Sequence, residues 1–153
     1  MNTWKRRTLM GAGMVTLVGC GGGSEDEPVL LALDRIVQPW SLTTLQESYV
    51  LRTEADWQRV WNLHQPATFA PVPLPRVDFN QFMVLGLTLG TGANGCYGLS
   101  IQRVLATSSQ AVVEYRFMEP GPNSACTLAL VPLTDFAVVR RIDGPVLYRR
   151  VTS

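Results

Sequence analysis

The chain of 153 residues has one histidine, three cysteines and a charged fraction of 16%. The single histidine, His64, argues against a conventional catalytic triad and excludes a metal site built from several histidines. The sequence also has no Gly-x-Ser-x-Gly elbow, calcium loop or zinc-ligand spacing. Its formal net charge of +1 lacks the basic excess that nucleic-acid binding requires. We therefore expect a protein that is not an enzyme, holds neither cofactor nor metal, and binds no nucleic acid.

Residues 1–19 have the pattern of a bacterial export signal. A basic segment, Lys5-Arg6-Arg7, precedes an apolar run at 8–18 that is too short to cross a bilayer as a helix. The run ends in Leu17-Val18-Gly19-Cys20, which resembles a lipobox, the motif in which the cysteine is acylated before cleavage. We predict lipidation of Cys20; the alternative is an ordinary export signal with a chance cysteine. The basic segment also loosely resembles a twin-arginine signal, so both export routes stay open.

Residues 20–27 are expected to form a flexible tether, because glycines, a serine and acidic residues there offer nothing to pack. Two or more acyl chains on Cys20 hold a protein firmly at a membrane. The residue after the cysteine is Gly21 and not an aspartate. By resemblance to the lipoproteins of diderm bacteria, this permits transport to the outer membrane. We expect a protein of the bacterial cell envelope, anchored on the periplasmic side, with the outer membrane favoured over the inner one.

Residues 28–153 are long enough for one domain with a substantial core. A first strand is expected within 28–40 and a short one at 48–52. Thr53 and Asp56 then form a capping-box pattern that begins a helix, and Pro66 ends it. This helix carries Trp57 and Trp61 on one stripe, which indicates a helix that covers a sheet. The alternative is a periplasmic binding protein for a small ligand in the groove between helix and sheet.

The rest of the chain has the alternation and turn signals of β-strands. The expected strands lie at 82–89, 96–106, 110–117, 127–131, 135–142 and 145–151. Thr107-Ser108-Ser109 predicts one hairpin turn, and Asp143-Gly144 predicts a second one. The fold class is therefore α+β, mainly β: an antiparallel sheet or sandwich of six to seven strands with one packed helix.

Gly90-x-Gly92-x-x-Gly95 matches the dinucleotide-binding fingerprint letter by letter. That fingerprint needs a helix after its last glycine, because the helix N-terminus holds the pyrophosphate. The following residues have a strand pattern instead, so we interpret 90–97 as a turn.

Cys96 and Cys126 remain as a pair once Cys20 is lipidated, and an even pair in an oxidising compartment predicts a disulfide. Two buried free thiols or a redox pair are the alternatives, although a redox pair normally has a Cys-x-x-Cys motif. A bridge would place the 90–97 turn beside the 119–125 loop. We predict a docking surface for another protein at these two loops, formed by Asn94, Tyr97, Pro120 and Asn123; otherwise these residues only shape turns.

Several of these elements occur in an order that resembles a known family. They are the helix with Trp57 and Trp61, Val77-Asp78-Phe79, the strand at 82–90, Tyr97-x-x-x-Ile101-x-x-Val104, and Pro120-Gly121-Pro122 before Cys126-Thr127. Over residues 48–142 the chain resembles the PrcB-like C-terminal domains, named for an accessory lipoprotein of a bacterial protease complex. The family's usual Gly-Gly-Tyr-Ser turn is Gly95-Cys96-Tyr97-Gly98 here.

This resemblance implies a small non-catalytic domain that binds or stabilises another exported protein, a protease being one candidate. The ligand-binding alternative at Trp57 and Trp61 comes second. An envelope hydrolase comes last, because the sequence offers one histidine and no spacing that favours a carboxylate pair such as Glu114 and Glu119.

Overall fold

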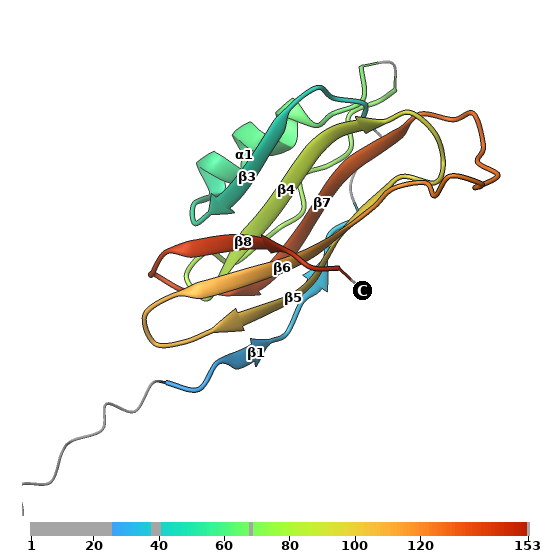
Figure 1. Ribbon diagram of the computed structural model, residues 1–153. Helices are drawn as coiled ribbons and strands as arrows, with labels where there is room; N and C mark the ends of the chain where they lie inside the picture. The colour runs from blue at the N-terminus through green and yellow to red at the C-terminus, as the bar shows by residue number, and fades with distance from the viewer. Residues whose placement is uncertain (1–25, 38–40, 68, 153) are drawn as a thin grey trace, which may run out of the picture.

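The computed structural model describes residues 26–37, 41–67 and 69–152. The predicted signal and Cys20 lie outside these residues. The described part of the chain forms three layers, which are one helix, a four-stranded sheet beneath it and a second four-stranded sheet beneath the first (Figure 1). This confirms the expected class, mainly β with one packed helix, and the sheets form a sandwich.

Each sheet contains strands from distant parts of the sequence, so that the chain passes back and forth between the two sheets. The sheet next to the helix has the order β2 (Asp34–Arg35), β7 (Val131–Arg140), β4 (Phe82–Gly92) and β3 (Gln46–Leu51). The other sheet has the order β1 (Val29–Leu31), β5 (Gly98–Ala106), β6 (Ala111–Met118) and β8 (Val146–Arg150). We call them the covered sheet and the open sheet. All pairs are antiparallel except β6 and β8, which run parallel.

The main core lies between the two sheets. Apolar side chains from β4 and β7 meet those of β5 and β6, and the buried members are Met83, Leu85, Ile101, Val104, Ala106, Ala111, Val113, Ala137 and Val139. On β5 and β6 these residues alternate with outward-facing ones, as expected for a sheet that buries one face. The outward-facing residues are both polar, such as Glu114, and apolar, such as Leu105 and Val112. The predicted Thr107–Ser109 turn is confirmed, because β5 and β6 pair antiparallel on either side of it.

Strand β4 is apolar almost throughout because it is buried on both faces. Met83 and Leu85 point into the core between the sheets, whereas Val84 faces the helix. Gly86 lies on the helix side, where a Cβ atom would come within 2.3 Å of the Phe136 ring. The sequence therefore has glycine there because an aromatic ring occupies the space of a side chain.

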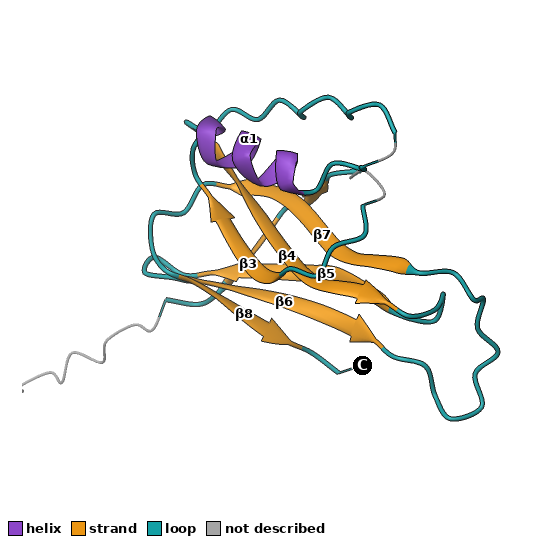
Figure 2. Ribbon diagram, turned by 90° about the horizontal axis from the view of Figure 1, so that it is seen from above, coloured by secondary structure: helices purple, strands orange, loops and turns teal. Residues whose placement is uncertain are grey.

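Helix α1 (Glu54–Leu63) begins as its capping pattern predicts. The Thr53 hydroxyl accepts a hydrogen bond from the Asp56 amide at 3.2 Å and donates one to the Asp56 carboxylate at 2.7 Å. The helix lies across the outer face of the covered sheet (Figure 2). No helix in the described ranges is both long and apolar enough to cross a membrane.

The N-terminal segment differs from the single strand expected within residues 28–40. It forms two short strands that enter different sheets: β1 pairs with β5, and β2 pairs with β7. Asp135 on β7 joins the sheets at this edge, because its carboxylate accepts hydrogen bonds from Arg35 at 2.8 Å and from the Ile101 amide at 2.7 Å. Burial raises the pKa of Asp135 in spite of these partners.

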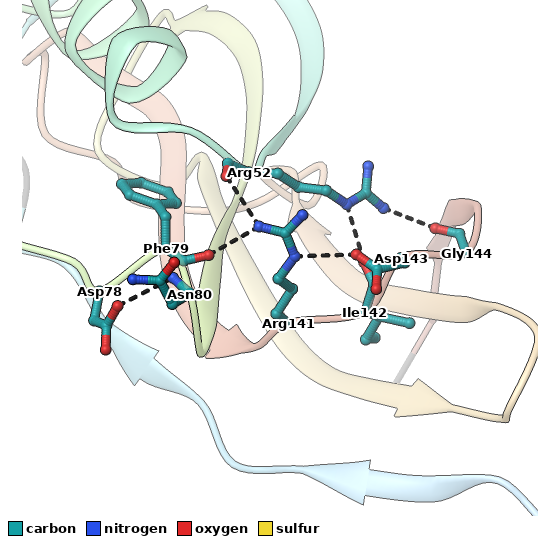
Figure 3. Close-up of polar contacts among 8 residues, drawn as sticks. All are labelled: Arg52, Asp78, Phe79, Asn80, Arg141, Ile142, Asp143 and Gly144. Atoms are coloured by element: carbon teal, nitrogen blue, oxygen red, sulfur yellow. Dashed lines mark hydrogen bonds and ion pairs between the residues drawn. The ribbon is translucent and has the colours of Figure 1, made fainter.

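The hairpin predicted at Asp143-Gly144 is wrong. Strand β7 already has β4 on one side and β2 on the other, so β8 finds its partner in the open sheet, at the free edge of β6. The crossing is held by Arg52, whose guanidinium donates to the carbonyls of Ile142 at 2.9 Å and Gly144 at 2.7 Å (Figure 3).

Arg141 fastens the chain that leads into β4 to the same crossing. Its guanidinium donates to the Phe79 carbonyl at 2.9 Å and to the Asp143 carboxylate at 3.0 Å (Figure 3). Asp78 caps the turn before β4, because its carboxylate accepts a hydrogen bond from the Asn80 amide at 3.0 Å. This hydrogen bond lowers the pKa of Asp78. The Val77-Asp78-Phe79 segment thus has a structural role at the end of the sandwich where β4 begins.

Candidate functional site

The predicted disulfide is confirmed. Cys96 and Cys126 are bonded across a sequence separation of 30, and their Cα atoms are 5.4 Å apart. The bridge joins the turn between β4 and β5 to the long connection between β6 and β7, and a backbone hydrogen bond from Gly95 N to Thr127 O at 3.0 Å supports it. Residues 93–97 and 119–130 therefore form one surface, which we call the bridged corner.

The glycine motif at this corner is not a nucleotide site, because strand β5 follows it instead of a helix. Two of the three glycines belong to β4, which continues to Gly92 and not to 89 as expected. Gly90 has a φ of 87°, a conformation that favours glycine. Gly95 lies so close to the partner loop that a Cβ atom would stand 2.1 Å from the Thr127 hydroxyl oxygen. Close approach of the two loops thus explains this glycine.

Residues 127–130 are not part of a strand, although one was expected there, and the chain bends at Leu128. Strand β4 ends at Gly92, which lies opposite Val131, so the strand pairing of β4 and β7 does not reach the residues before Val131. Leu128 is consequently 100% exposed, and Leu130 is 51% exposed. Because Cys126 is bridged and Val131 is in the sheet, this short segment is fixed at both ends. Sequence reasoning missed Leu128, since its alternation with Thr127 and Ala129 indicates a paired strand.

Tyr97 packs against the body of the sandwich. Its ring stacks on Phe117 with a centroid distance of 6.2 Å, and the Arg150 guanidinium lies 4.9 Å from the Phe117 centroid. Arg150 also forms an ion pair at 2.8 Å with Glu119, which is the first residue of the long loop after β6. These contacts attach both loops of the corner to the open sheet, and an exposed ion pair of this kind adds little stability of its own.

A surface depression of about 570 Å³ lies beside the bridge. Its lining includes the half-buried Pro120 and the exposed Ser124, together with Arg116 on β6. The depression therefore has a mixed polar and apolar wall at the place where the predicted docking loops meet.

The four predicted docking residues have different environments. Asn94 is half-buried, and its side-chain oxygen accepts a hydrogen bond from the Cys96 amide at 3.0 Å, which shapes the turn. Tyr97 is half-buried against Phe117. Pro120 lines the depression and Asn123 is exposed. The bridge brings both loops together, but Asn94 and Tyr97 also make internal contacts that hold the corner in shape.

The space between helix and covered sheet, proposed above as an alternative ligand groove, is filled by side chains. Trp57 is 0% exposed and Trp61 is 1% exposed. Their indole nitrogens donate to the carbonyls of Pro75 and Val72, each at 3.0 Å, so the proline-rich segment after α1 closes over them. This packing favours the structural role of both tryptophans.

His64 belongs to the same aromatic cluster. It is 2% exposed at the end of α1, and its ring lies 5.4 Å from the Phe136 centroid and 5.9 Å from the Tyr49 centroid. Neither ring nitrogen has a hydrogen-bond partner among the described residues. Burial lowers the pKa of His64, although the Glu47 charge acts in the opposite direction. The ring is thus a neutral packing element.

Glu114 is a buried carboxylate whose structural role the sequence did not indicate. It lies on the outer face of the open sheet and is bound by Arg103 on β5 and Arg149 on β8. Hydrogen bonds from the two guanidinium groups lower the pKa of Glu114. The carboxylate is therefore occupied by an ion-pair ladder, which gives it a structural role.

Within the described ranges, no three histidine, cysteine, aspartate or glutamate side chains come together as a set that could hold a metal ion. Comparisons with protein-family models, curated proteins and solved structures gave no match. The resemblance to PrcB-like domains therefore stays a prediction.

Proposed function

We propose that the chain is a non-catalytic, lipid-anchored protein of the bacterial cell envelope that binds or stabilises another exported protein through the bridged corner. The observation that carries this proposal is the fully exposed Leu128 in a segment fixed at both ends. An exposed apolar side chain on a segment whose two ends are fixed gains burial on binding and costs little backbone entropy to order.

The surroundings of Leu128 fit a protein surface better than a small ligand. The corner consists of protruding loops with Pro120 and Asn123 beside a shallow depression, whereas small-ligand sites are usually enclosed. Loops on a rigid sheet are common docking elements. A protease is one candidate partner, as the resemblance to an accessory lipoprotein of a protease complex implies.

Photocrosslinking in cells tests the docking proposal. A photoreactive residue in place of Leu128 should capture one protein with an export signal, and Leu128→Asp should abolish copurification of that protein and lower its abundance. The matched control is Leu63→Asp, which changes a 51% exposed leucine at the end of α1 and should leave the complex intact. A partner that binds Leu128→Asp and the wild-type chain equally would refute the proposal.

The anchor is tested separately. Cys20→Ser should abolish incorporation of a labelled fatty acid and release the protein from membranes, since attached acyl chains supply the membrane affinity. Fractionation of inner and outer membranes checks the proposed outer-membrane location. Continued lipid labelling of Cys20→Ser would refute attachment at this residue and leave the docking proposal unaffected.

A further inference from the structure

The outer face of the open sheet carries an apolar row that crosses all its strands. Strand register places Leu30 beside Leu105, Leu105 beside Val112, and Val112 beside Leu147. Their strand neighbours Leu31, Val104, Val113 and Tyr148 pack in the core, so these four side chains point away from it. Leu30 is 63% exposed and Leu147 is 53% exposed. No element of the described chain covers this face (Figures 1 and 2).

Charges of opposite sign flank the row. On the side of the row that leads to the bridged corner, Arg103 and Arg149 form ion pairs with Glu114. The side chains of these two arginines are 57% and 59% exposed. Beyond the other side of the row, the turn after β5 meets two exposed acidic residues, Asp26 and Glu27, and the Ser108 hydroxyl donates a hydrogen bond to Asp26. The face thus has a basic side, an apolar centre and an acidic side.

We infer that this face binds the same face of a second copy of the chain, with a two-fold axis that runs along the apolar row. Rotation about that axis preserves position across the sheet, so it brings Asp26 and Glu27 before β1 of each copy towards Arg103 on β5 of the other. It also packs leucine and valine side chains at the centre. An isologous contact of this kind needs a self-complementary surface, and the order basic, apolar, acidic provides one. An anionic lipid surface, in contrast, would attract the arginines but repel Asp26 and Glu27.

The size of the face predicts a weak dimer. Four strands about 4.8 Å apart are about 19 Å wide, and because the row lies near one end of β6, the second copy covers only about 20 Å of strand length around the axis, or roughly 400 Å² per copy. The two areas together amount to roughly 800 Å², which is below the roughly 1,200 Å² of stable specific interfaces and in the range of weak, transient contacts. Confinement of both copies to one membrane would raise their effective concentration. This inference concerns a surface separate from the bridged corner and does not depend on the docking proposal.

Cysteine crosslinking tests both the contact and its axis. Every residue of the row lies on the proposed axis and should face its own counterpart. In cells that produce the full-length chain, Leu30→Cys and Leu147→Cys, one at each end of the row, should each form a crosslinked homodimer after mild oxidation. The band should double in apparent mass on a non-reducing gel. Leu128→Cys is the control, because it introduces a thiol at the bridged corner where the native residue is more exposed than either row residue.

Two results would overturn the inference. If Leu30→Cys and Leu147→Cys crosslink only when both variants are present together, the axis runs along the strands and the charge argument fails. If neither variant forms more crosslinked homodimer than the Leu128→Cys control, no such dimer forms. In that case the two row thiols can be tested with a water-soluble maleimide, and protection from this reagent would assign the face to another partner, such as a lipid surface. Asp26→Lys with Glu27→Lys should reduce the crosslinking of both row variants, because it removes the acidic side; undiminished crosslinking would refute the charge complementarity.

Discussion

Removal of the Cys96–Cys126 bridge should lower the stability of the whole sandwich. The bridge closes a loop with a sequence separation of 30, and the chain-entropy model then assigns about 3.6 kcal/mol to its restriction of the unfolded chain. Native domains are stable by only about 5–15 kcal/mol, so this is a large share. We expect the double variant Cys96→Ser, Cys126→Ser to remain folded and to lose on the order of 10 °C in Tm.

Urea unfolding followed by tryptophan fluorescence measures this loss. Trp57 and Trp61 are residues of α1 and are buried between the helix and the covered sheet, away from the bridge. Their fluorescence therefore reports on unfolding of the sandwich and not on local change at the corner. The stability difference should be obtained from the shift in midpoint together with the slope, because the bridge also limits how far the unfolded chain expands.

The control for the double variant is the wild-type chain in reductant, which should unfold at the same urea concentration. Agreement of these two samples, both below the oxidised wild-type chain, attributes the difference to the covalent link and not to the serine side chains. If the double variant were as stable as the oxidised wild-type chain, the reasoning from unfolded-chain entropy would be refuted for this protein.

Two further substitutions test the packing around α1. Gly86→Ala should destabilise the fold by about 1–3 kcal/mol, because its methyl group would overlap the Phe136 ring; Gly121→Ala, whose nearest neighbour is Ser124 Oγ at 3.4 Å, should be far milder in the same denaturation assay. Because burial lowers the pKa of His64, the unfolded chain binds its proton first, and stability should fall as pH drops below about 6.5. His64→Phe should flatten that part of a stability–pH curve, and an unchanged slope would show that other groups cause it.

Local signals allowed several elements to be predicted from the sequence. The Thr53 cap and the tryptophan stripe are sufficient for α1, and alternation around Thr107-Ser108-Ser109 is sufficient for the β5–β6 hairpin. The cysteine pair was predicted by counting the thiols of a chain that is expected to be exported. In each case the information lies within one segment or in composition, so no knowledge of distant neighbours is required.

The main errors concern the choice of a partner strand. Asp143-Gly144 is a good hairpin signal, but β7 has no free edge, so the chain crosses to the open sheet. Residues 127–130 alternate like a strand, yet β4 ends opposite Val131 and leaves them outside the strand pairing. The exposure of Leu128, and with it the best candidate for a docking anchor, depends on where another strand ends. The pattern of residues within one segment carries no information about where a neighbouring strand ends or which strand edge is free.

The two proposed surfaces are geometrically compatible with one membrane. Strands β5 and β6 have the bridged corner at one end and the apolar row near the other, so a dimer through the row leaves both corners free. A two-fold axis along the row also keeps the β1 edges of the two copies on the same side of the dimer, and the segment after Cys20 leads directly into β1. Both tethers could therefore enter the same bilayer, whereas an axis along the strands would send them to opposite sides. The orientation that matches the charges is thus also the one that two anchored copies can adopt.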